Sequence, residues 1–136
     1  ADTANEALRS QPNSTKLLKE AGTLLKRLHD SGMAHGDIKL ANFYVSGNDM
    51  GFWDLDSAML FSNGTPEKWR IRDLGRLLSS FIITVDSMPE TSEEFFDVKT
   101  FAQTLGQSYG IDASRILSHF ESYWLKKMKI QHTIKL

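Results

Sequence analysis

The polar segment at residues 35–42 most constrains the fold, because two patterns of opposite kind meet there. Before it, apolar residues recur at helical spacing over residues 17–28. After it, residues 43–45 have the composition of a short strand. An acid, a cation and an amide oxygen held on one loop are the groups that phosphoryl transfer requires. The segment carries these three groups on Asp37, Lys39 and Asn42.

A second strand-like stretch at residues 51–53 follows a turn signal at residues 46–49. The two strands predict a hairpin, and a hairpin pairs its outer ends whatever lies in its turn. Asn42 precedes the first strand and Asp54 follows the second. We therefore expect the hairpin to bring Asn42 close to Asp54.

Apolar residues at helical spacing predict three further helices. The first begins at Asp73 and is strongly apolar. The second begins at Thr91 or Ser92 and stops at Gly106. The third has Asp112 as its N-cap.

The domain organisation follows from these patterns. Residues 1–13 are polar and are interpreted as an arm or linker, and residues 14–136 as a single domain. The basic tail at residues 126–136 is expected to fray. The predicted fold class is mainly α (α+β): a helical bundle with a small β-hairpin that carries the polar loops.

Composition excludes several classes of function. The formal net charge of -1 gives no basic field for nucleic acid. The chain has no cysteine, which excludes disulfides, thiolate metal sites and a cysteine nucleophile and is typical of a reducing compartment. Its longest apolar runs are far too short to span a bilayer.

The polar loop resembles the catalytic loop in the C-terminal lobe of the protein-kinase-like superfamily. His35, Asp37 and Asn42 match the pattern H-x-D-x-x-x-x-N in register. The segment Trp53-Asp54-Leu55-Asp56 resembles the magnesium segment that is D-F-G in protein kinases. The resemblance implies the fold of a kinase-like C-terminal lobe for residues 14–136.

Two departures from protein kinases point to another branch of that superfamily. Gly36 stands where many protein kinases have arginine, and Asp56 stands where they have glycine. Residues 52–58 and 72–78 are most similar to the bacterial lipopolysaccharide kinase (Kdo/heptose kinase) family. That similarity implies a kinase with an alcohol group as acceptor, and ATP and Mg²⁺ as cofactors.

The resemblance also implies roles for individual residues. Asp37 would accept or orient the proton of the acceptor hydroxyl, and Lys39 would neutralise charge on the migrating phosphoryl group. His35 and Asp73 would support the loop from within the protein. Oxygen ligands for Mg²⁺ would come from Asn42, Asp54 and Asp56.

Ordinary structural roles stay open for the same residues. Asp37 alone could make a turn hydrogen bond, and Lys39 could be a solvated loop lysine. Asp56 is as well explained by a turn or helix cap as by a metal ligand.

The nucleotide-binding N-terminal lobe of the superfamily has no counterpart before residue 17. The chain is therefore either the catalytic half of a longer kinase or a lobe that has lost activity, and we expect it to be inactive in isolation. The predicted function is an ATP-dependent phosphotransferase acting on a sugar hydroxyl of lipopolysaccharide core. The alternatives are a non-catalytic kinase-like binding module and a small-molecule kinase of the aminoglycoside or choline type.

The expected partners are a nucleotide, a sugar or lipopolysaccharide acceptor and the missing N-terminal lobe, with no nucleic acid. The expected location is the bacterial cytoplasm. Binding of the acceptor would bring the protein to the inner face of the inner membrane.

Overall fold

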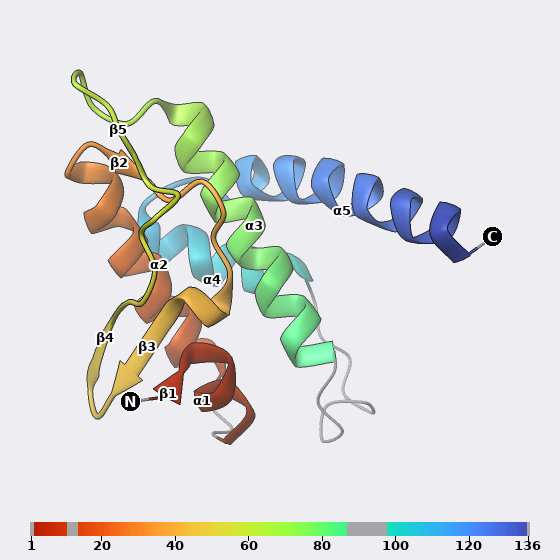
Figure 1. Ribbon diagram of the computed structural model, residues 1–136, viewed down its shortest axis with the longest axis horizontal. Coiled ribbons are helices and arrows are strands. Elements are labelled where there is room, and N and C mark those ends of the chain that lie inside the picture. Colours follow the sequence, from red (N-terminus) through yellow and green to blue (C-terminus); the bar gives the residue numbers. More distant parts are fainter. Residues whose placement is uncertain (1, 11–13, 87–97, 136) are drawn as a thin grey trace.

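A computed structural model describes residues 2–10, 14–86 and 98–135 and shows a mainly helical chain with two small antiparallel sheets, as the predicted α+β class requires. Its helices are α1 (Ala4–Ser10), α2 (Ser14–Asp30), the 3₁₀ helix η1 (Leu40–Asn42), α3 (Glu67–Asp86), α4 (Val98–Tyr109) and α5 (Ala113–Lys135). Its strands are β1 (Asp2–Thr3), β2 (Met33–Ala34), β3 (Phe43–Ser46), β4 (Asp49–Phe52) and β5 (Met59–Leu60). Figure 1 shows α5 leaving the body of the molecule toward the C-terminus. Among the helices of the described ranges, none has the length and apolar character needed to cross a membrane.

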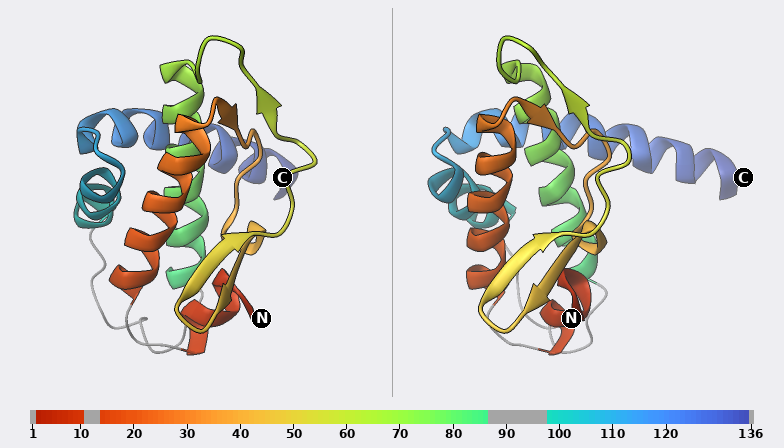
Figure 2. Two further views of the ribbon diagram at one scale, coloured as in Figure 1. Left: turned by 90° about the vertical axis from the view of Figure 1, so that its left-hand side faces the viewer. Right: turned by 60° about the vertical axis from the view of Figure 1, so that its left-hand side comes forward.

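The predicted hairpin is confirmed. Strands β3 and β4 pair antiparallel from Phe43 opposite Phe52 to Ser46 opposite Asp49, and β1 adds to the free edge of β3 (Figure 2). Gly47 in the turn has a φ of +62°, which a glycine adopts without steric cost. A second, two-stranded sheet joins β2 to β5, and the hydrophobic patterns did not predict it.

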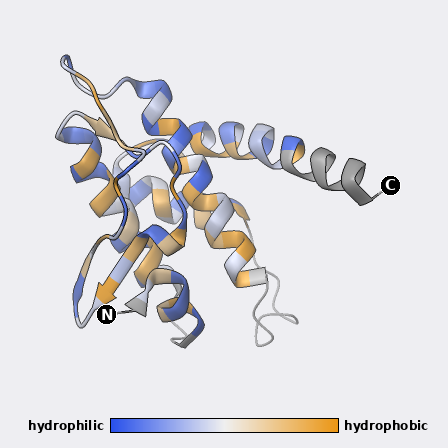
Figure 3. Cartoon of the chain, in the orientation of Figure 1, coloured by the Kyte–Doolittle hydropathy of each residue, from blue (hydrophilic) through white to orange (hydrophobic). Residues whose placement is uncertain are grey.

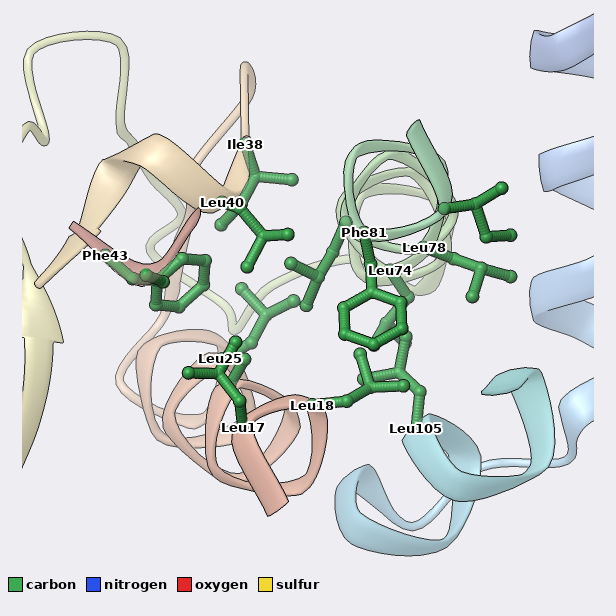
Figure 4. Close-up of a cluster of buried hydrophobic side chains, with 14 of the residues drawn as sticks. Leu17, Leu18, Leu25, Ile38, Leu40, Phe43, Leu74, Leu78, Phe81 and Leu105 are labelled. Carbon is green, nitrogen blue, oxygen red and sulfur yellow. The ribbon is translucent and has the colours of Figure 1, made fainter. Parts of the chain in front are cut away.

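The core lies where α2, α3 and α4 face one another. Each of these helices contributes a stripe of apolar side chains at helical spacing. Figure 4 shows Ile38, Leu40 and Phe43, from the polar loop and the strand after it, packed against this cluster. All three are buried, and each contributes roughly 1.5–3 kcal/mol of transfer free energy. The loop that carries the polar residues is therefore anchored on both sides of Lys39.

The expected polar arm at residues 1–13 is wrong for its described part, because residues 2–10 form β1 and α1. Ala4, Ala7 and Leu8 follow the spacing i, i+3, i+4 and are buried in the core. Three small or apolar side chains in a polar stretch gave too weak a periodic signal to predict this helix.

Helix α3 begins at Glu67, six positions before the predicted start at Asp73. Pro66 suits this position, since its fixed φ favours a helix start and its carbonyl accepts the backbone N–H of Trp69 and of Arg70. The acidic Glu67 in the first turn complements the helix dipole. Asp73 is consequently inside the helix rather than at its start.

The last two helices agree in part with the prediction. The predicted starts at Thr91 and Ser92 lie outside the described residues. The predicted stop at Gly106 is wrong, because helix α4 passes through Gly106 and ends at Tyr109. Gly110 follows with a φ of +93°, the conformation in which glycine commonly ends a helix. A Cβ on Gly106 would lie 2.7 Å from the Ile111 carbonyl oxygen, so this glycine serves close packing.

The N-cap predicted for α5 is confirmed. The Ser114 N–H donates to Asp112 Oδ1 at 2.9 Å, and this hydrogen bond lowers the pKa of Asp112. The helix continues to Lys135, although the tail from residue 126 was expected to fray.

Candidate active site

The polar loop turns sharply at Gly36, immediately after strand β2. Gly36 has a φ of +89°, and a Cβ there would lie 3.1 Å from the Ser57 carbonyl oxygen. A larger residue would therefore be strained by both its backbone conformation and its surroundings. The turn leaves Asp37 on the surface, with 62% of its side chain exposed.

Asp73 lies beneath this loop and is completely buried. One carboxylate oxygen accepts the His35 N–H at 2.8 Å, and the other accepts the Gly36 N–H at 3.1 Å. Because Asp73 extends from α3 in the core, its two hydrogen bonds fix the backbone just before Asp37. Asp73 lies inside α3 and not at its N-terminus, and from there its carboxylate reaches the loop.

A buried histidine, His29, also contacts the Asp73 carboxylate. His29 Nε2 lies 2.8 Å from Asp73 Oδ2, and His29 Nδ1 lies 2.5 Å from Tyr109 Oη. Since a carboxylate only accepts, His29 Nε2 carries a proton; in a neutral imidazole Nδ1 accepts from the phenol. Burial raises the pKa of Tyr109 to about 12, against the opposing effect of Arg70, which donates to its oxygen at 3.1 Å. The network thus connects α2, α3 and α4 behind the loop.

Sequence reasoning did not foresee that Tyr109 and Arg70 take part in this network. Tyr109 is eighty positions away from His29, so no local spacing relates the two residues. A buried tyrosine with a hydrogen-bonded hydroxyl is common, and its sequence context carries no signal of its partner.

His35 links the loop to the segment after the hairpin. Its Nδ1 accepts the Asp37 N–H at 3.3 Å, and its Nε2 lies 2.8 Å from the Asp54 carbonyl oxygen. An Nδ1 that accepts and an Nε2 that donates define one neutral tautomer of the imidazole. His35 is itself buried and therefore fixes the separation of Asp37 and Asp54 from inside.

The hairpin closes directly beside these residues. The Trp53 N–H donates to the Asn42 carbonyl oxygen at 2.7 Å, which extends the pairing of β3 and β4 by one step. The backbone of Asn42 is therefore in contact with that of Trp53, which directly precedes Asp54, as the predicted hairpin requires. Asn42 Oδ1 accepts the Lys39 N–H at 2.7 Å and shapes the turn into η1.

Asp54 and Asp56 form a small acidic turn at the end of β4. Asp54 Oδ1 accepts the Asp56 N–H at 2.9 Å, and both residues are exposed. Within the described ranges, no three His, Cys, Asp or Glu side chains gather into a metal-binding group. Mg²⁺ does not require such a group, because it binds through one or two carboxylates and keeps several waters or phosphate oxygens. Carboxylate and amide oxygens at Asp54, Asp56 and Asn42 fit that hard cation.

Two basic side chains accompany Asp37. Lys39 is exposed on the loop. Arg76, from α3, donates to the Gly36 carbonyl oxygen at 2.8 Å, and its Nη1 lies 4.0 Å from Asp37 Oδ1. Sequence reasoning missed Arg76, although a charged residue three positions after Asp73 in a strongly apolar helix was a signal for it.

Comparison with known proteins identifies the class. The model of the lipopolysaccharide kinase (Kdo/WaaP) family matches residues 2–103, which cover the loop, the hairpin and α3. By class, therefore, the chain is a kinase-like phosphotransferase. It belongs to the lipopolysaccharide kinase (Kdo/WaaP) family, as the resemblance of residues 52–58 and 72–78 indicated. Comparisons with curated proteins and with solved structures gave no match.

Proposed function

We propose that this protein transfers the γ-phosphate of ATP to a sugar hydroxyl of lipopolysaccharide core, at the inner face of the bacterial inner membrane. One observation supports this proposal in addition to the family membership. His35 accepts from the Asp37 backbone and contacts the Asp54 carbonyl oxygen, so one buried side chain couples the two acids that phosphoryl transfer would use. In this account the chain corresponds to a kinase-like C-terminal lobe, and residues 2–10 are part of it because they pack into the same core.

The two exposed charged residues of the loop each have a chemical role in this proposal. Asp37 accepts the proton of the acceptor hydroxyl, since its carboxylate is exposed while its backbone is held by His35. Lys39 neutralises the charge that develops on the migrating phosphoryl group. Asp73 touches neither substrate and acts by positioning the loop.

Mg²⁺ would be held by Asn42 and Asp54, with Asp56 beside them. When bound, the ion supplies charge neutralisation on the phosphate oxygens. Asp54 has one carboxylate oxygen engaged by the Asp56 N–H, which orients the carboxylate before a metal arrives.

Transfer of labelled phosphate from ATP to lipopolysaccharide core, measured with the complete gene product, tests this function. Mapping the phosphate on the product by mass spectrometry identifies the sugar. Loss of the label to water or to the protein alone would contradict a sugar kinase.

The 136-residue chain alone is expected to bind ATP with a Kd weaker than about 1 mM and to transfer no phosphate. Its sequence has no glycine-rich loop of the type that covers nucleotide phosphates, and most of the catalytic gain in phosphoryl transfer comes from such positioning. Calorimetry with ATP and Mg²⁺ measures this directly. Micromolar binding would show that the chain holds a complete nucleotide site, by itself or as a dimer.

A further inference from the structure

Basic and aromatic side chains gather where α3 packs against α5. On each helix they follow the spacing of a single face. The set, called the α3–α5 face below, consists of Trp69, Arg72 and Arg76 on α3 and of His119, Tyr123 and Lys126 on α5. Figure 3 shows hydrophilic positions interrupting the hydrophobic ones along both helices. The face therefore combines two arginines, a lysine and a histidine with two aromatic rings.

The imidazole of His119 lies directly against α3. A Cβ on Gly75 would lie 2.5 Å from His119 Cδ2, so the glycine makes room for the ring. Burial, followed by the positive charges of Arg76, Arg72 and Lys126, lowers the pKa of His119. Each of these charges repels the protonated ring. Such a group of like charges around a partly buried imidazole is unfavourable until an anion compensates it.

Aromatic rings hold the two guanidinium groups of this face. Arg72 lies over the Trp69 ring at 4.8 Å, and Arg76 lies over the Tyr123 ring at 5.3 Å. Among the described residues, Arg72 has no carboxylate partner, and Arg76 has Asp37 at 4.0 Å. Stacking fixes the direction of a guanidinium group and leaves its terminal N–H donors available for an anion.

The donors of this face reach the surface at three residues. Arg72 is partly exposed: its Nε is buried, but its two terminal nitrogens are accessible and make no hydrogen bond within the described part of the chain. His119 is also partly exposed, and Lys126 is exposed two turns further along α5. A ligand on the surface between the two helices can therefore meet a guanidinium, an imidazole and an ammonium group.

These three groups match the chemistry of a phosphate group. Phosphate presents several oxygen acceptors around one centre, and arginine binds two of them with parallel N–H donors. Lysine contributes a mobile point charge, and a protonated histidine adds a further donor. A metal cation is excluded here, because the nearest charges are all positive.

We propose that the α3–α5 face binds a phosphate group at a site separate from the catalytic loop. The terminal nitrogens of Arg72, the ring of His119 and the ammonium group of Lys126 donate to its oxygens. The phosphate is carried by the headgroup of an anionic membrane lipid or by a soluble phosphorylated compound. None of these three residues takes part in the proposed phosphate transfer, so the inference does not depend on that function.

NMR of the His119 ring in the ¹³C,¹⁵N-labelled 136-residue chain tests the site directly. Inorganic phosphate is the probe, and NaCl keeps the ionic strength constant so that screening does not change. We expect a saturable shift of the ring signals, with a Kd of roughly 1–10 mM. The pKa of His119 should rise at saturation, because the bound anion offsets the neighbouring cations. A linear shift without saturation, or an unchanged pKa of His119, would overturn the proposal.

Three variants, each losing one positive charge, separate the site from general electrostatics. Arg72→Gln should weaken phosphate binding about tenfold or more, and Lys126→Gln about threefold. Arg27→Gln is the control, because Arg27 is exposed on α2. Lys126 is exposed as well, so Lys126→Gln tests the site even where Arg72→Gln prevents folding. Equal affinities of the Lys126→Gln and Arg27→Gln variants would overturn the proposal.

Sedimentation with lipid vesicles identifies the source of the phosphate. The two probes are vesicles of phosphatidylglycerol and of phosphatidylcholine, at about 0.15 M salt. Binding to phosphatidylglycerol alone, competed by inorganic phosphate and lost in Lys126→Gln, supports a lipid headgroup. Binding of inorganic phosphate without binding to either vesicle supports a soluble compound. Vesicle binding that inorganic phosphate does not compete and that Lys126→Gln does not weaken would overturn the site.

Failure of this site and failure of the proposed kinase are distinguishable. Phosphate binding by the chain, without phosphate transfer by the complete gene product, would contradict the kinase and keep the site. Phosphate transfer to sugar, without binding of inorganic phosphate at His119, would contradict the site and keep the kinase.

Discussion

Replacing Asp73 by alanine lowers the free energy of unfolding by about 3–5 kcal/mol, because three buried donors lose their acceptor together. The donors are the backbone N–H groups of His35 and Gly36 and the ring of His29. The carboxylate has no contact with solvent in the folded protein, since Asp73 and His29 are fully buried. Urea unfolding followed by circular dichroism measures the change.

The matched control is Asp49→Ala, which removes an exposed carboxylate from β4. Its expected effect is within about 0.5 kcal/mol. Asp73→Asn should fall between the two, because its amide keeps one acceptor but turns a donor toward the loop. Equal stabilities of the Asp73→Ala and Asp49→Ala variants would mean that the loop does not depend on this carboxylate.

Replacing Asp54 by asparagine reduces Mg²⁺-dependent turnover of the complete gene product by on the order of 100- to 1,000-fold, or roughly 3–4 kcal/mol of transition-state stabilisation. The fold should be retained for two reasons. Asparagine keeps an oxygen for the Asp56 N–H, and the contact with His35 uses the Asp54 backbone carbonyl.

The control for Asp54→Asn is Asp49→Asn, because Asp49 is an exposed acid at the turn end of the same hairpin, opposite the end that carries Asn42 and Asp54. Asp56→Asn is the informative third variant: a loss comparable with Asp54→Asn indicates a ligand, and full activity indicates a turn residue. Undiminished turnover of the Asp54→Asn variant at limiting Mg²⁺ would contradict the assignment of Asp54 as a Mg²⁺ ligand.

The hairpin could be predicted from the sequence, because it pairs residues that are close together in the chain. Strand-like residues on either side of a glycine-containing turn determine the register, and the register brings Asn42 to the segment of Asp54. The N-cap at Asp112 was predictable for the same reason, since the acceptor and its N–H lie two positions apart.

The support of the loop was not predictable in the same way. His29, Asp73 and Tyr109 come from three helices, and only their packing brings them together. Pattern reasoning placed Asp73 at a helix start because it stands just before the apolar run. The structure shows that the apolar run begins about two turns after the start of the helix.

The surroundings of the serines in α3 could not be predicted from the apolar pattern of that helix. Leu74, Leu77, Leu78 and Phe81 gave a strong apolar pattern, and serines among them are compatible with a buried helix. Whether a buried hydroxyl has a partner depends on the neighbours of each atom.

The central claim is that Asp37, held by His35 and Asp73, promotes phosphate transfer to a sugar hydroxyl. Its most direct test compares the complete gene product with its Asp37→Asn variant, using labelled ATP, Mg²⁺ and lipopolysaccharide core. We predict labelled sugar from the first protein and a rate lower by about 10²–10⁴-fold in the second, with unchanged thermal stability. Equal rates of sugar phosphorylation by the two proteins, or no sugar phosphorylation by either, would contradict the claim.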